Sequence, residues 1–167
     1  MPRPASDPTA PQESDGPGSG PGPRSLDDAA LSALLADGTF GTLATTRRDG
    51  HPHLSTVVYR WDPGARVVRI STTADRLKVR QLERDPKSAL HVSSDDHWSF
   101  AVAEGSAELS PLTTTPGDAV GHELLALTPG FDDPAEEAAF LRQVVDDRRL
   151  VIRLRVTRLY GTALDMP

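Results

Sequence analysis

Two short turn signals separate three runs of β-forming residues in the first half of the chain, and they constrain the fold more than any other feature. The runs cover residues 40–46, 53–61 and 67–72, and the turns are Arg48-Asp49-Gly50 and Asp62-Pro63-Gly64. Turns of this length join antiparallel neighbours, whereas parallel strands need a long crossover, usually a helix. The spacing therefore predicts an antiparallel α+β domain and argues against a doubly wound parallel sheet.

The rest of the chain adds further strands and several helices. A helix is predicted from Ser25, read as its N-cap, to a stop at Gly38, and Gly105 is predicted to mark a bulge in a long strand. Six strands joined mostly by hairpins predict a small barrel with peripheral helices. The other predicted strands cover residues 89–93, 98–109 and 150–157, and the other predicted helices cover 75–84 and two segments within 117–146.

Composition divides the chain into a tail and one domain. Residues 1–24 are rich in Pro and Gly and nearly free of aliphatic residues, so we expect a disordered tail, followed by one folded domain over residues 25–167. The net charge of -6 and the pI near 5.3 argue against a nucleic-acid partner. No stretch is apolar enough for a membrane span or signal peptide, so the expectation is a soluble, cytoplasmic protein. With no cysteine, thiolate chemistry is excluded.

The stretch Ser71 to Leu82 concentrates groups that bind phosphate. Hydroxyls of Thr72 and Thr73 precede a predicted helix start that carries Arg76 and Lys78, and Lys78 is one of only two lysines. Backbone amides at a helix start together with hydroxyl and cationic side chains favour a phosphate group. The competing interpretation is that these cations form the solvated face of a helix whose apolar residues face the core.

Other candidate residues leave more than one interpretation open. Trp98 follows an acidic turn and begins a strand, so it is either the wall of an aromatic pocket or a core anchor. His51 and His53 have the spacing that places two imidazoles on one strand face, but no third metal ligand is evident, so no metal site is predicted. No Gly-x-Ser-x-Gly elbow or catalytic triad is present, and no catalytic side chain is assigned.

Five segments taken in order resemble the pyridoxamine 5'-phosphate oxidase-like split β-barrel proteins. The resemblance covers roughly residues 27–161. Within this family the chain most resembles the actinobacterial coenzyme F420-dependent oxidoreductases, chiefly through the Arg-x-Lys and Trp-Ser-Phe-Ala-Val segments. The matching segments are Gly41-Thr42-Leu43-Ala44-Thr45, Asp49-Gly50-x-Pro52, Ser55-Thr56-Val57, Thr73-x-x-Arg76-x-Lys78-x-x-x-Leu82-x-Arg84-Asp85-Pro86 and Asp95-Asp96-His97-Trp98-Ser99-Phe100-Ala101-Val102-Ala103-Glu104-Gly105.

The resemblance implies a fold, a cofactor and a reaction. It implies an antiparallel six-stranded split β-barrel of the FMN- or F420-binding type, homodimeric, with the cofactor in a groove between subunits. The implied activity is hydride transfer from reduced deazaflavin F420 to an electron-poor small organic acceptor such as an enone, quinone, tetrapyrrole or nitro compound. The helices within residues 117–146 are expected to determine what enters the cleft. By resemblance the cofactor-binding residues are His53, Ser55, Thr56, Val57, Thr72, Thr73, Arg76, Lys78 and Trp98.

Two alternatives stay open at this point. One is an FMN flavoprotein related to pyridoxamine 5'-phosphate oxidase, for which Arg153, Arg155 and Arg158 are available as basic residues near the C-terminus. The other is a protein that binds F420, FMN or haem without turnover.

Overall fold

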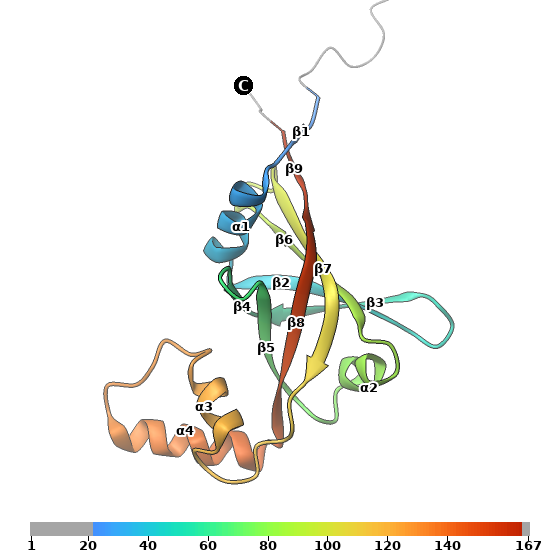
Figure 1. Cartoon of the computed structure of the whole chain (residues 1–167). Helices are drawn as coiled ribbons and strands as arrows, with labels where there is room; N and C mark the ends of the chain where they lie inside the picture. The colour runs from blue at the N-terminus through green and yellow to red at the C-terminus, as the bar shows by residue number, and fades with distance from the viewer. Residues whose placement is uncertain (1–21, 165–167) are drawn as a thin grey trace, which may run out of the picture.

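One antiparallel sheet of seven strands, curled on itself, forms the body of the protein (Figure 1). The computed structural model describes residues 22–164. The strand order is β3-β2-β6-β7-β8-β5-β4, and a separate two-stranded pair, β1 with β9, extends one end. The strands are β1 (Arg24–Ser25), β2 (Phe40–Thr46), β3 (Pro52–Val58), β4 (Arg60–Asp62), β5 (Val67–Thr73), β6 (Lys87–Ser93), β7 (Phe100–Leu109), β8 (Arg149–Tyr160) and β9 (Thr162–Ala163).

The predicted tail falls mostly outside the described part of the chain. Residues 1–21 are not among the described residues, so the prediction of disorder there stays a prediction. Within the described part, Arg24 pairs with Ala163 and Ser25 with Thr162. A strand therefore begins one residue before the predicted start of the domain at Ser25.

The sheet contains seven strands, so the predicted count of six is wrong. The run 53–61, predicted as one strand, is divided at Tyr59 into β3, which pairs with β2, and β4, which pairs with β5. Tyr59 is buried, with 2% of its surface exposed, and its hydroxyl donates a 2.7 Å hydrogen bond to the carbonyl oxygen of Leu35. Burial of this phenol also raises its pKa to about 12.

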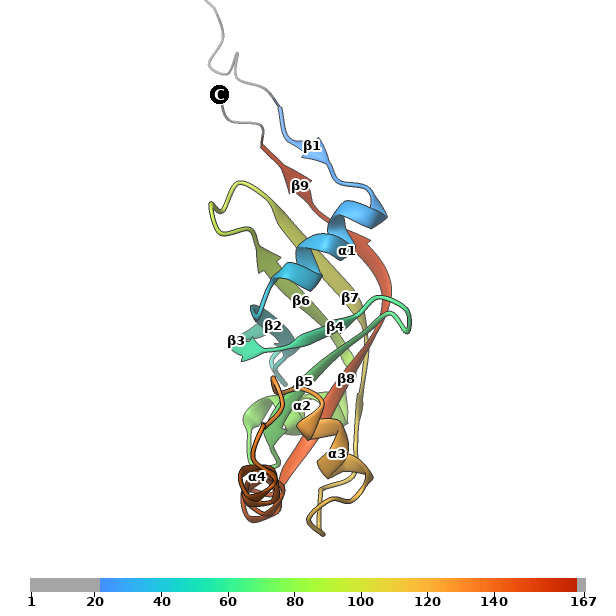
Figure 2. The same cartoon turned by 90° about the vertical axis from the view of Figure 1, so that its left-hand side faces the viewer.

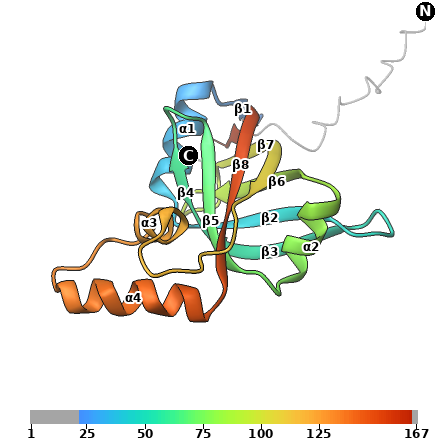
Figure 3. The ribbon, with the colours of Figure 1, turned by 60° about the horizontal axis from the view of Figure 1, so that its bottom comes forward.

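The division at Tyr59 makes the two edge strands of the sheet consecutive in the chain. β3 lies at one edge and β4 at the other, and only Tyr59 separates them. The strands curl so that these edges approach each other, with β3 in contact with β5 (Figures 2 and 3). The predicted antiparallel α+β class is confirmed, and the sheet is a curled half-barrel.

Four helices lie around the sheet in the described part of the chain: α1 (Asp28–Asp37), α2 (Leu77–Arg84), α3 (Ala119–Leu125) and α4 (Pro134–Asp146). The N-cap of α1 is Asp27, whose carboxylate accepts from the amide of Ala30 at 2.8 Å, so the prediction of Ser25 is wrong. Ser25 is instead committed to the pairing with β9. None of the four is long and apolar enough to cross a membrane.

The glycines at two predicted breaks are required by close contacts. A Cβ on Gly38 would lie 2.4 Å from the Tyr59 hydroxyl, so the end of α1 leaves room for that side chain. A Cβ on Gly105 would lie 1.8 Å from the carbonyl oxygen of Arg155, and the pairing of β7 with β8 shifts register between Glu104 and Gly105. The predicted bulge in the long strand is therefore confirmed.

The pair α3–α4 packs on the outside of the sheet, away from the main core. Val120 and Leu124 of α3 and Val144 of α4 bury Val151 of β8, which points opposite to its neighbours Leu150 and Ile152 in the main core. Strand β8 is thus apolar on both faces near its start. The helices project beyond the sheet on the side away from α2 (Figures 1 and 3).

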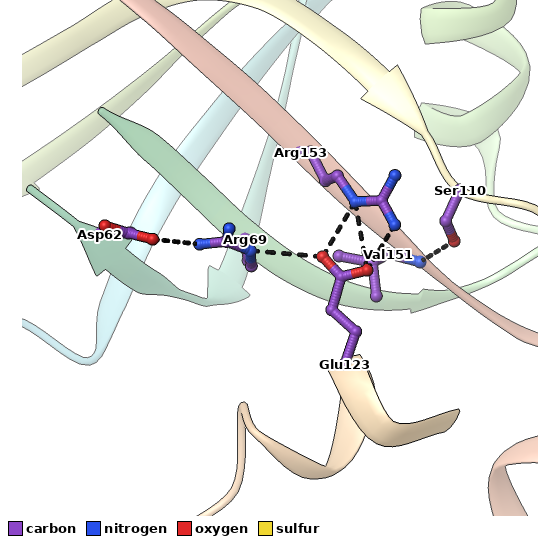
Figure 4. A network of polar contacts seen from close by, with 6 residues as sticks. All are labelled: Asp62, Arg69, Ser110, Glu123, Val151 and Arg153. Atoms are coloured by element: carbon purple, nitrogen blue, oxygen red, sulfur yellow. Dashed lines mark hydrogen bonds and ion pairs between the residues drawn. The ribbon is translucent and has the colours of Figure 1, made fainter. Parts of the chain in front are cut away.

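An ion network joins α3 to the sheet (Figure 4). Glu123 accepts from Arg153 Nε at 2.9 Å and from Arg69 Nε at 3.3 Å, and it also pairs with a terminal nitrogen of Arg153. Arg69 in turn pairs with Asp62 at 2.9 Å. The hydrogen bond from Arg153, the largest cause, together with the charges of both guanidinium groups, lowers the pKa of Glu123 below its usual 4.5.

We expect Glu123→Gln to lower the free energy of unfolding by about 1 to 2 kcal/mol at neutral pH, because a charge-assisted pair that is partly shielded from solvent is lost. The pKa of Glu123 is lower in the folded than in the unfolded state. Its contribution is therefore present above about pH 4.5 and lost as the pH falls further. Denaturant titrations from pH 7 to pH 3 should show the difference between variant and wild type shrinking.

Glu108→Gln is the matched control, because Glu108 pairs with Arg155 where both side chains are half exposed. This variant should leave the unfolding free energy close to that of the wild type. Equal losses in the two variants, or a Glu123→Gln difference that does not change with pH, would contradict the role given to Glu123.

Candidate functional site

A cavity of about 750 Å³ lies between the sheet and the pair α3–α4. Its floor is the β3–β4 junction, residues 56–60, and the last half of β5, residues 69–73. The start of α2 borders one end, and α3, α4 and the first residue of β8 form the opposite wall. Because β3 and β5 meet only where the sheet edges converge, the break at Tyr59 creates this floor.

Two cations at the start of α2 face this cavity without partners. In the part of the chain that the structure describes, the side chains of Arg76 and Lys78 form no ion pair and no hydrogen bond, and both line the cavity. Burial, and secondarily the charge of Arg76, lowers the pKa of Lys78 from its usual 10.5. Two like charges held close together and partly desolvated are stabilised when an anion binds between them.

The hydroxyl groups beside these cations differ in their availability. Thr72 is buried, with 5% of its surface exposed, and within residues 22–164 its hydroxyl has no hydrogen-bond partner. The hydroxyl of Thr73 already donates to the carboxylate of Asp75. That hydrogen bond, the largest cause, lowers the pKa of Asp75. Thr72 is therefore the free hydroxyl of the pair.

The wall formed by the helices is largely apolar. Leu124 of α3, Leu127 just beyond it, and Phe140 and Val144 of α4 line the cavity. Arg60 Nε donates to the carbonyl oxygen of Leu127 at 3.4 Å and so joins the floor to this wall. These wall residues fall within or just beyond the segment 117–146, and the expectation that this segment determines what enters the cleft stays a prediction.

Sequence reasoning missed the polar side chains at the end of the helical wall. Asp147 and Arg149 line the cavity and pair at 3.1 Å, and Arg149 also donates to the hydroxyl of Ser71 at 3.2 Å. Hydrogen bonds, first from Gln143 and then from Arg149, lower the pKa of Asp147, so this carboxylate is ionised at neutral pH. Asp147 and Arg149 reach the cavity because Thr73 of β5 pairs with Arg149 of β8, and no local sequence motif indicates that register.

The cavity brings together six of the nine predicted cofactor-binding residues. They come from three segments: the β3–β4 junction, the end of β5 and the start of α2. These residues are Thr56, Val57, Thr72, Thr73, Arg76 and Lys78.

The other three predicted residues do not line this cavity. His53 lines a separate cavity, and its Nδ1 lies 2.9 Å from Oε1 of Gln81. Ser55 has a buried hydroxyl oxygen with no partner among the described residues, and it does not line the large cavity. Trp98 is 45% exposed in the turn between β6 and β7, at the opposite end of the sheet from α4 (Figure 1). A role for these three in cofactor binding stays a prediction.

The exposure of Trp98 bears on the choice between a pocket wall and a core anchor. An exposure of 45% is inconsistent with a core anchor, and the carbonyl oxygen of Trp98 accepts from the amide of Leu164 at 2.8 Å. Across residues 22–164, no three His, Asp or Glu side chains gather in a way that would hold a metal ion.

Comparison with known proteins gives relatives over most of the chain. A curated relative, the F420H2-dependent biliverdin reductase of Mycobacterium tuberculosis, is 27% identical over 138 residues, which cover 83% of this chain and 89% of the relative. A solved structure named as an F420 reductase is 27% identical, covers 77% of this chain and 94% of its own, and superposes with a TM-score of 0.55.

A second solved structure agrees in fold. It is a conserved hypothetical protein of Mycobacterium tuberculosis, 22% identical, with a TM-score of 0.67 over 85% of this chain and 89% of its own. The family model described as pyridoxamine 5'-phosphate oxidase matches residues 27–163, which include the whole curled sheet and the cavity beside it. The chain therefore belongs to the pyridoxamine 5'-phosphate oxidase family, and the family predicted from its motifs is confirmed.

Proposed function

We propose that the protein is an F420-dependent oxidoreductase whose cofactor binds in the large cavity with its phosphate at Arg76 and Lys78. The observation that carries the proposal is this pair of unpartnered cations at one end of a cavity whose opposite wall is apolar. A phosphate needs charge-assisted hydrogen bonds, and a planar ring system needs an apolar surface that excludes water. The relatives with F420 in their names support this choice of cofactor.

The residues of this chain would bind the cofactor, orient it and shield it from water. Thr72 supplies a free hydroxyl beside the cations, and the residues Thr56 and Val57 of β3 lie along the floor. Reduced F420, once bound, would supply the hydride for an electron-poor organic acceptor, and the protein would contribute orientation and exclusion of water. Asp147 is ionised and held by Arg149, so it is not a proton donor to the product. Biliverdin, the substrate named for the curated relative, is a reasonable first acceptor to test.

FMN in the same cavity is the second candidate cofactor, because the family takes its name from pyridoxamine 5'-phosphate oxidase. In the oxidase alternative, the arginines near the C-terminus would bind the phosphate of pyridoxal phosphate, but each of them already pairs with a carboxylate. Arg153 binds Glu123, Arg155 binds Glu108 and Arg158 binds Glu104. These pairs weaken the oxidase alternative, although they leave FMN binding itself possible.

We expect fluorescence titration of the full chain to give tight binding of F420 and weak binding of FMN. The double substitution Arg76→Ala with Lys78→Ala should weaken F420 binding by about 2 to 5 kcal/mol, roughly 30-fold or more in Kd, because the charge-assisted contacts to the phosphate are lost. Oxidation of reduced F420 on addition of biliverdin or a quinone then separates a reductase from a protein that only carries the cofactor.

Arg155→Ala with Arg158→Ala is the control, since it removes the same charge from paired positions outside the cavity. F420 affinity should be unchanged in this variant. Tight FMN binding with weak F420 binding would move the protein to the flavin alternative, and unchanged F420 affinity in the Arg76 and Lys78 variant would refute the site.

We also propose that the protein is a homodimer formed through the outer face of β2 and β3. Three large apolar side chains are exposed there: Phe40 at 65%, Leu54 at 62% and Val58 at 52%. Phe40 and Val58 are direct partners across the two strands, so they share one face. Thr56 and Val58 on this face also line the large cavity, so a second copy seated here would border the cofactor.

Light scattering on a sizing column should therefore give twice the chain mass of 17.9 kDa. Phe40→Glu with Leu54→Glu should shift the protein to monomers, because two charges would be buried in the interface. Leu77→Glu is the control, since Leu77 is 47% exposed but lies on α2. A monomeric wild type, or a double variant that stays dimeric, would rule out this interface.

A further inference from the structure

A second cavity, of about 470 Å³, lies on the other side of α2, between this helix and the β2–β3 hairpin. Arg47 and Arg48 of the hairpin and Arg80 and Arg84 of α2 line it. None of its lining residues lines the large cavity. It is therefore separate from the proposed cofactor site.

The charge of this second cavity is strongly positive in a chain whose net charge is -6. Four guanidinium groups face one carboxylate, that of Asp49, which pairs with Arg47 at 3.0 Å. Arg84 donates to the carbonyl oxygen of Thr46. Within the described chain, the side chains of Arg48 and Arg80 form no hydrogen bond and no ion pair, while the charge of Arg80 contributes to lowering the pKa of Asp75. Exposed arginines are often simply solvated, so charge alone does not make this a site.

A buried side chain at the base of the cavity is the second observation. Gln81 has 3% of its surface exposed, yet it lines this cavity. Its Oε1 accepts from the hydroxyl of Thr45 at 2.7 Å and from Nδ1 of His53 at 2.9 Å. Its Nε2 finds no partner among residues 22–164. This nitrogen is not one of the fully buried unpaired atoms of the described chain, so it is open to the cavity as a donor that an acceptor from outside the chain can reach.

We propose that this cavity binds a phosphate-bearing small molecule at a site distinct from the cofactor cavity. Arg48 and Arg80 supply forked donors that match phosphate oxygens, and Gln81 Nε2 adds a fixed donor at the base. A phosphate group accepts hydrogen bonds at every oxygen, which is what a cavity lined by unpaired donors requires. Leu77, 47% exposed at the rim, offers an apolar contact to the organic part of the ligand.

Isothermal titration calorimetry with pyrophosphate as the probe tests this site, at fixed ionic strength because screening weakens such contacts. The titrations use the full chain carrying Arg76→Ala and Lys78→Ala, so that the cations of the large cavity do not contribute. In this background, Arg48→Gln with Arg80→Gln should raise the Kd for pyrophosphate at least tenfold. Gln81→Glu, which keeps the acceptor oxygen but replaces the Nε2 donor, should weaken binding as well.

The control in the same background is Arg155→Gln with Arg158→Gln, which changes the net charge equally at a distance from the cavity. Its Kd should match that of the background protein. An equal loss in both double variants would show binding to general positive charge and overturn the proposal. Absence of pyrophosphate binding once Arg76 and Lys78 are removed would place the anion in the large cavity and overturn it equally.

Discussion

The path of the chain at Tyr59 is the constraint on which the rest of the structure depends. At this residue the chain leaves its pairing with β2 and enters its pairing with β5, so one continuous segment serves both edges of the sheet. The Tyr59 ring is held in the core, and its hydroxyl is bound to the carbonyl oxygen of Leu35 in α1. Without this fixed corner the edges would not converge, and the floor of the large cavity would not form.

The cations around the large cavity are of two kinds: some form ion pairs that stabilise the fold, and others form none and are candidates for binding a ligand. Arg69 and Arg153 both pair with Glu123, Arg69 also pairs with Asp62, and these contacts hold α3 against the sheet, which places the apolar wall over the floor. Arg76 and Lys78 face the same cavity but have no such partner in the described chain. The two kinds of cation are thus distinguished by whether they form ion pairs and not by residue type.

Much of the fold follows from local sequence signals. The hairpin ends at Gly50, whose φ of 84° suits glycine, and the pair of helices near the C-terminus begins at the capping residues Asp118 and Asp133. These signals act over a few residues, so they can be read without the rest of the chain. The break at Tyr59 could not be read in this way, because the run 53–61 is β-forming throughout and only long-range pairing divides it.

The candidate site was predicted best where its residues are contiguous. The stretch from Thr72 to Lys78 lies in one turn between β5 and α2, so its members meet through local geometry. Arg149 and Phe140 reach the cavity only through strand register and helix docking, which the sequence does not display. Trp98 was predicted to be a pocket wall or a core anchor, and the resemblance placed it at the cleft, but in a single chain the fold places it in a turn away from the cavity.

Hydrogen exchange of the full chain with and without F420, read by mass spectrometry, tests the central claim about the cavity most directly. Binding there should slow exchange in residues 56–60 and 71–80 and in the helical wall over 124–149, because these segments line it. Segments remote from it, such as the β1–β9 pair, should be unchanged. Protection that leaves residues 71–80 unaffected would contradict the account.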